Sequence, residues 1–92
     1  MTTLHMDVEQ ARQTQSTMSS THQQLASLMQ SLTSAVLGLE PAWLGNSASE
    51  FFGDYEQLKT STNKSLDDLN LLSGRLQKEI DEWEMMASKL SA

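Results

Sequence analysis

The residues that could do chemistry in this 92-residue chain are two histidines and a group of carboxylates. His5 and His22 fall on the same helical arm, and the sequence has no cysteine, no zinc-binding pattern and no phosphate-binding loop. The carboxylates are Glu79, Asp81, Glu82 and Glu84. Their spacing is typical of a solvated helix face, where no pocket tunes an acid or a base. We therefore predict a protein that is not an enzyme and holds no metal and no cofactor.

The most informative residues stand near the middle of the chain. Trp43, Leu44 and Gly45 follow Pro41 at the one clear break between two long stretches of helical periodicity. Gly45 permits a backbone bend. Trp43 has two compatible roles, because a large aromatic can pack over the end of a helical hairpin or can anchor an exposed docking surface.

The first stretch predicts a helix over residues 8–39. Asp7 and Gln10 have the spacing of a capping box. Apolar positions then recur at alternating intervals of three and four residues, which is the heptad pattern of a coiled coil. This seam comprises Val8, Ala11, Gln15, Met18, His22, Leu25, Met29, Leu32, Val36 and Leu39. Leu28 and Ala35 widen it toward the end, so we expect this end to contact more than one neighbour.

The second stretch predicts a helix over residues 47–90, with a turn over residues 40–46. Its apolar positions are Ala48, Phe51, Tyr55, Leu58, Thr62, Leu66, Leu69, Ser73, Leu76, Ile80, Trp83, Ala87 and Leu90. Two long helices joined by a short turn must run antiparallel. The sequence therefore predicts a single all-α domain over residues 1–92, folded as a helical hairpin.

A lone hairpin has too small an interior to offset the entropy of ordering its residues. We therefore expect it to dimerise into a four-helix bundle, with either a copy of itself or a different chain. The residues expected in the seams of the hairpin and the dimer are Met18, Leu25, Leu28, Met29, Leu32, Val36, Leu39, Phe51, Tyr55, Leu58, Leu69, Leu76, Ile80 and Trp83.

Charge excludes some classes of partner. The net charge is −6, which disfavours binding to nucleic acid and to anionic membranes. No apolar run approaches the roughly 20 residues of a membrane span, and the N-terminus lacks the pattern of a cleaved signal peptide.

No charged residue stands between Arg12 and Glu40. This gap indicates either a buried contact surface or simple drift in composition, and the sequence leaves both open.

These features resemble the WXG family of small helical-hairpin proteins over essentially the whole chain. The residues that carry the resemblance are Trp43, Leu44 and Gly45 in the turn, Ala48, Phe51 or Phe52, Tyr55, and the extended start over residues 4–9. The resemblance implies type VII secretion without a cleaved signal peptide, from the cytoplasm, as a homodimer or as a heterodimer with a related WXG-type protein. It also implies an FtsK/SpoIIIE-type secretion ATPase as a partner. Trp43 and Gly45 would then be recognition residues.

The chain departs from the family pattern in one respect. Many members carry Tyr-x-x-x-Asp/Glu after the second helix, whereas Tyr55 lies early in that helix and is followed four residues later by Lys59. Ile80 and Glu84 match only a looser form of the pattern. An alternative is therefore a cytoplasmic adaptor or chaperone that pairs with a larger secreted cargo. A membrane-active helical protein is a weaker alternative, because the basic face typical of such helices is missing.

Overall fold

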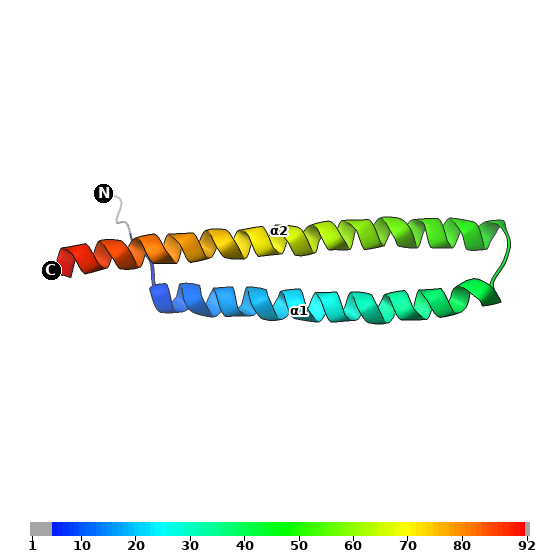
Figure 1. The fold of residues 1–92 in the computed structure, drawn as a ribbon, viewed down its shortest axis with the longest axis horizontal. Helices are drawn as coiled ribbons and strands as arrows, with labels where there is room; N and C mark the ends of the chain where they lie inside the picture. The colour runs from blue at the N-terminus through cyan, green and yellow to red at the C-terminus, as the bar shows by residue number, and fades with distance from the viewer. Residues whose placement is uncertain (1–4, 92) are drawn as a thin grey trace.

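Two long helices dominate the structure, a computed structural model that describes residues 5–91. Helix α1 spans Val8–Leu39, the short 3-10 helix η1 spans Glu40–Ala42, and helix α2 spans Asn46–Ser91. The helices lie side by side and antiparallel (Figure 1). The part of the chain that is described contains no strand. These observations confirm the all-α class and the hairpin arrangement.

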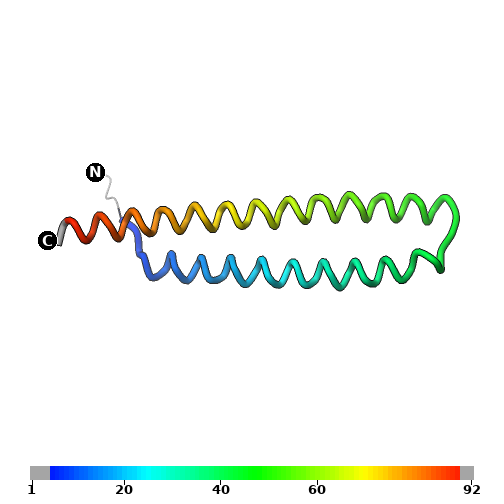
Figure 2. Tube along the Cα trace, in the orientation of Figure 1, coloured from blue at the N-terminus to red at the C-terminus, as the bar shows by residue number. Residues whose placement is uncertain are grey.

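The hairpin is long and thin. Its principal extents are 70 × 24 × 17 Å, and its radius of gyration is 20.8 Å, against roughly 12 Å for a compact domain of this length. The two arms stay adjacent along their length, so each helix has a single neighbour (Figure 2). A helix with one neighbour can bury only one side of itself.

Helix α1 begins at a side-chain cap. The backbone N–H of Gln10 donates a hydrogen bond of 3.0 Å to Oδ1 of Asp7. This bond satisfies one of the backbone donors that every helix start leaves unpaired. Glu9 adds a negative charge to the first turn, where the helix dipole favours it.

The turn between the helices bends at a single glycine. Pro41 lies within η1, and the Trp43 N–H donates to the Glu40 carbonyl oxygen at 3.4 Å. Gly45 has a φ of +122°, a backbone conformation that residues with a Cβ rarely adopt. Gly38, which also lies near the end of the first helix, remains inside α1. The sharp change of direction therefore depends on Gly45.

The interior is correspondingly small. Among the residues whose side chains are described, the buried ones are Val36, Ala48, Tyr55 and Ile80. Three of these four lie in the half of the hairpin next to the turn, and Ile80 lies near the open end. Most of the apolar seam is thus only half-covered by the opposite helix.

Polar contacts join the two helices at three positions along the hairpin. Gln15 Nε2 donates to the Ser73 carbonyl oxygen at 3.4 Å, and Thr33 and Tyr55 bond through their hydroxyl groups. Arg12 pairs with Glu84 near the open end. These contacts fix which residue of α1 lies opposite which residue of α2. No helix in the described part of the chain is long and apolar enough to cross a membrane.

Candidate interaction surfaces

The residues predicted for the seams fall into three groups. Val36, Tyr55 and Ile80 are buried between the helices. The half-buried members are Met18, Leu25, Met29, Leu69, Leu76 and Trp83. The members that remain exposed are Leu28, Leu32, Leu39, Phe51 and Leu58. The single stripe of the sequence therefore divides into a part that α1 and α2 cover for each other and a part that nothing in the hairpin covers.

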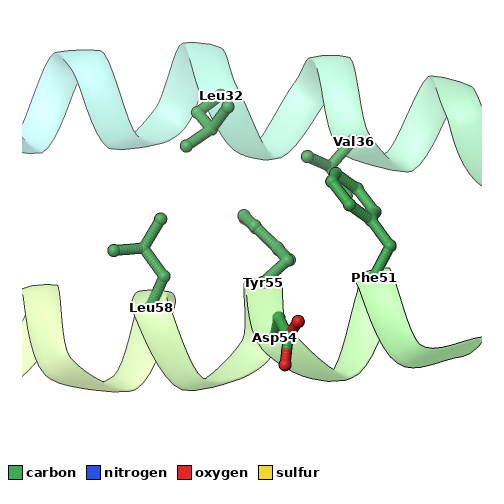
Figure 3. Close-up of a pocket in the computed structure, with 6 residues that line it drawn as sticks. All are labelled: Leu32, Val36, Phe51, Asp54, Tyr55 and Leu58. Atoms are coloured by element: carbon green, nitrogen blue, oxygen red, sulfur yellow. The ribbon is translucent and has the colours of Figure 1, made fainter.

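Part of the uncovered stripe borders a groove of about 320 Å³ between the helices. The residues that line this apolar groove are Leu32, Val36, Phe51, Asp54, Tyr55 and Leu58. Leu32 and Val36 come from α1, and Phe51 reaches across from α2 toward Val36 (Figure 3). The carboxylate of Asp54 is the one charged group in this lining. Such a surface offers hydrophobic contact area and almost no hydrogen-bonding capacity.

Tyr55 connects the apolar groove to the opposite face of the hairpin. Its ring lines the groove, while its hydroxyl bonds to Oγ1 of Thr33. Thr33 Oγ1 donates to the Met29 carbonyl oxygen at 2.8 Å. Because threonine has a single O–H, Thr33 must accept the bond from Tyr55. The ring of Tyr55 is thus held in place by a hydrogen bond to α1 as well as by packing.

The opposite face has a different character. A second groove, of about 340 Å³, is lined by Ala26, Met29, Gln30, Thr33, Lys59 and Asn63. Lys59 follows Leu58 directly, so the two side chains are about 100° apart around α2. This polar groove has four hydrogen-bonding side chains, from Gln30, Thr33, Lys59 and Asn63, beside the apolar Ala26 and Met29. It therefore gives no reason to expect a dry contact with another protein.

Three aromatic rings gather at the turn end. The Trp43 ring lies 5.3 Å from that of Phe51 and 5.9 Å from that of Phe52, centroid to centroid. The two phenylalanine rings are 5.4 Å apart in an edge-to-face arrangement, which is a favourable geometry for aromatic pairs. Trp43 is half-buried by these contacts, whereas Leu44 is 86% exposed. The turn thus combines a packed tryptophan with a projecting leucine.

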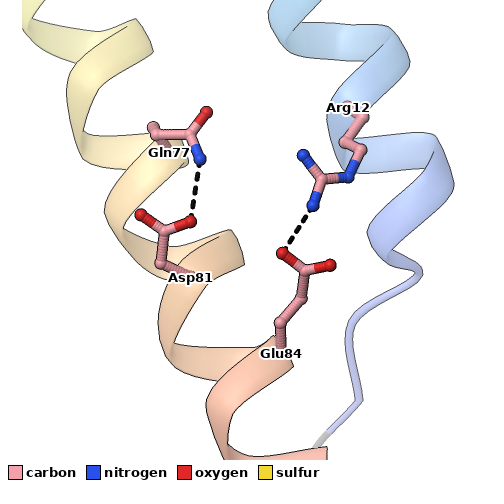
Figure 4. A network of polar contacts seen from close by, with 4 residues as sticks. All are labelled: Arg12, Gln77, Asp81 and Glu84. Carbon is pink, nitrogen blue, oxygen red and sulfur yellow. Dashed lines mark hydrogen bonds and ion pairs between the residues drawn. The ribbon is translucent and has the colours of Figure 1, made fainter.

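The open end carries the carboxylates that the sequence singled out. Arg12 pairs with Glu84, and Gln77 Nε2 donates to Asp81 Oδ1 at 2.9 Å (Figure 4). Both carboxylates are exposed. Glu82 is also exposed, and Glu79 is half-buried. In the described part of the chain, no group of three or more histidine, aspartate or glutamate side chains is placed to hold a metal ion.

The sequence did not reveal two features of these surfaces, the contact of Thr33 with Tyr55 and the exposure of Leu44. Thr33 is polar and lies beside the seam, so only the register of the helices reveals that it meets Tyr55. Leu44 stands between Trp43 and Gly45 in the sequence, and its exposure depends on the conformation of the turn. The one sequence feature that could have indicated this exposure is an apolar residue directly before a turn glycine.

Comparison with known proteins agrees with this architecture. No curated protein and no solved structure matches the chain. The family model WXG100, described as proteins of 100 residues with WXG, matches residues 3–88. This match covers nearly all of the chain and includes α1, the turn with Trp43 and Gly45, and α2 as far as residue 88. The chain therefore belongs to the WXG100 family.

Proposed function

We propose that this chain is a non-enzymatic substrate of a type VII secretion system and that it acts as a homodimer through protein–protein recognition. Membership of the WXG100 family supports the link to secretion. The observation that carries the dimer is the apolar groove, which remains uncovered in the hairpin.

The surface area of the hairpin supports a dimer. Its accessible surface is 7207 Å², about 1900 Å² more than the roughly 5300 Å² expected for a compact folded monomer of this mass. A standard interface buries about 800 Å² on each partner, and obligate dimers bury more. The hairpin therefore has ample surface to form a stable interface on one face while leaving the other face in water.

The composition of the two faces indicates which one is covered. Leu32, Phe51 and Leu58 are exposed apolar side chains on the rim of the apolar groove. A second hairpin packed here would complete a four-helix bundle, with these side chains in its core. Leu28 and Leu39 also lie on the exposed side of α1, four residues before Leu32 and seven after it, so they would extend the same contact along the helix.

Trp43 and Gly45 would form the recognition end of the molecule. Gly45 sets the bend, and Trp43 holds the turn against Phe51 and Phe52. Leu44 and Gly45 do not line the apolar groove, so we expect this end to stay accessible when two hairpins pair. The proposed recognition partner is an FtsK/SpoIIIE-type secretion ATPase.

An export assay tests the proposed function. The chain is produced in cells that carry a type VII secretion system, and the amounts in cell and supernatant are compared for the wild type and Trp43→Ala. We expect the wild type in the supernatant and the variant retained in the cells, with an unchanged helix content by circular dichroism. Retention of the wild type by cells that export their own substrates would contradict the proposal. So would normal export of the variant.

A further inference from the structure

The three residues of the turn do not share the same environment. Trp43 is half-buried and contacts two phenylalanine rings. Leu44 is 86% exposed, the highest value among the exposed large hydrophobic residues that the structure describes. Burial of an exposed leucine by a partner is favourable, because it removes apolar surface from water. Trp43 therefore supports the turn, and Leu44 is its exposed apolar side chain.

The backbone on both sides of Leu44 is fixed. The Trp43 N–H is bonded to the Glu40 carbonyl oxygen, and the Gly45 carbonyl oxygen accepts from the Ser49 N–H at 3.1 Å. The positive φ of Gly45 sets the direction in which the chain leaves Leu44. A side chain presented from an ordered backbone loses less conformational entropy on binding than one on a loose loop.

The charged residues nearest the turn in the sequence are acidic. Four of the twelve carboxylates and none of the six basic residues lie between residues 13 and 58. These carboxylates belong to Glu40, Glu50, Asp54 and Glu56, and all four residues are exposed. Glu40 also lines a pocket of about 270 Å³ together with Trp43 and Leu44. Lys59, the first basic residue of α2, lies beside Glu56 and Asp54 on that helix, whereas Glu40 and Glu50 lie nearer the turn and have no basic residue within eight positions in the sequence. The turn end is therefore an apolar tip with negative charge beside it.

From this arrangement we infer that Leu44 inserts into an apolar pocket of a partner protein and that lysine or arginine side chains line the rim of that pocket. The inference rests on the proposed function, because it names the chemistry of the partner that the turn end recognises. Negative charge at the tip repels nucleic acid and anionic lipid headgroups, whereas it steers the tip toward a basic protein surface.

The first test separates Leu44 from Trp43 in the export assay. Leu44→Ser leaves the fold intact, since Leu44 makes no buried contact, so melting temperature and dimer formation should match the wild type. We expect its export to fall by at least about tenfold, the loss in affinity when a partner pocket no longer buries a leucine. Normal export of Leu44→Ser would overturn the inference. If Trp43→Ala blocked export at the same time, the proposed function would stand.

The second test identifies the chemistry of the pocket. The photoreactive residue p-benzoylphenylalanine replaces Leu44 in secreting cells. The same replacement at Leu28, an exposed leucine of α1 away from the turn, is a control that should not capture the same peptide. After irradiation, the crosslinked peptide is identified by mass spectrometry. We expect a peptide from one protein, rich in apolar residues and flanked by lysine or arginine. A crosslink to lipid, to a segment without basic residues, or no crosslink in cells that export the protein would overturn the inference.

Charge reversal provides the matched control. The double variant Glu40→Lys with Glu50→Lys should reduce both the crosslink at position 44 and export. Asp67→Lys with Glu82→Lys makes the same change in net charge at exposed positions of α2 away from the turn, so it should reduce neither. Equal effects of the two double variants would show that net charge alone matters, and the basic rim would then be rejected.

Discussion

The two faces of this hairpin are built from the same two helices, yet they differ in kind. One face has the apolar groove, where Leu32 and Leu58 remain exposed although they are hydrophobic. The other has the polar groove, where Gln30, Lys59 and Asn63 lie beside the apolar Ala26 and Met29. A protein that worked as an isolated hairpin would have no need for this difference, because both faces would meet water.

The contrast shows how one stripe of residues can serve two interfaces. Alternating intervals of three and four place a stripe along each helix, and the single neighbouring helix covers only its centre. In α1 the centre is Val36, which is buried, and the flank is Leu32, which is not. The apolar flanks of α1 and α2 lie on the same face, so they add up to one uncovered surface.

The largest effect is expected from a charge in the apolar groove. Leu58→Glu places a carboxylate where the proposed dimer buries a leucine, and an unpaired buried charge costs several kcal/mol. We expect the dimer dissociation constant to rise by at least about 100-fold, measured by sedimentation. Asn63→Glu adds the same single charge on the polar groove and should leave dimerisation unchanged. Similar effects of both variants would remove the distinction between the faces.

A smaller change in the same groove should have a smaller effect. Leu32→Ala removes apolar surface that is already partly exposed in the hairpin, so the monomer loses little. The dimer loses the burial of that surface, and we expect its dissociation constant to rise by about tenfold. Gln30→Ala, two residues earlier on the polar groove, is the control. An unchanged dissociation constant for Leu32→Ala would place Leu32 outside the interface.

Tyr55 tests the link between the two faces. Tyr55→Phe keeps the ring that lines the apolar groove and removes the hydroxyl that bonds to Thr33. We expect a loss of about 1 kcal/mol in the free energy of unfolding, measured by urea denaturation at a fixed protein concentration. Combined with Thr33→Val in a double-mutant cycle, the two changes should be non-additive. Additive losses would mean that the hydroxyl bond contributes nothing to stability.

The smallest effect is expected at the open end. Arg12 and Glu84 join the helices, but both side chains are about half-exposed. Surface ion pairs of this kind contribute roughly 0.2–1 kcal/mol and are weakened by salt. Arg12→Ala should therefore lower the melting temperature by only a few degrees and leave dimerisation intact. Loss of the dimer in this variant would show that the interface extends to the open end.

Much of the fold follows from sequence patterns that depend on local structure. The heptad spacing of α1, the cap at Asp7 and the break at Pro41 are local signals, and they predict the hairpin and its all-α class. The tripeptide Trp43, Leu44 and Gly45 between the helices identifies the family. These features need no knowledge of which residues meet across the molecule.

The division of the seam could not be predicted in the same way. Val36 and Leu32 have the same character and nearly the same place in the pattern, and only the angle between the two helices decides which one is buried. The bond between Thr33 and Tyr55 depends on the register of α1 against α2, since Thr33 carries no apolar signal of its own. The exposure of Leu44 depends in turn on the backbone angles at Gly45.

Sedimentation equilibrium of the purified chain tests the central claim most directly, with far-UV circular dichroism on the same sample. We expect a highly helical species at twice the monomer mass of 10.2 kDa, converted to monomer by Leu58→Glu and unaffected by Asn63→Glu. A stable, fully helical monomer for the wild type would contradict the claim that the apolar groove is an interface. A poorly helical monomer would contradict self-association and indicate that a different chain completes the bundle.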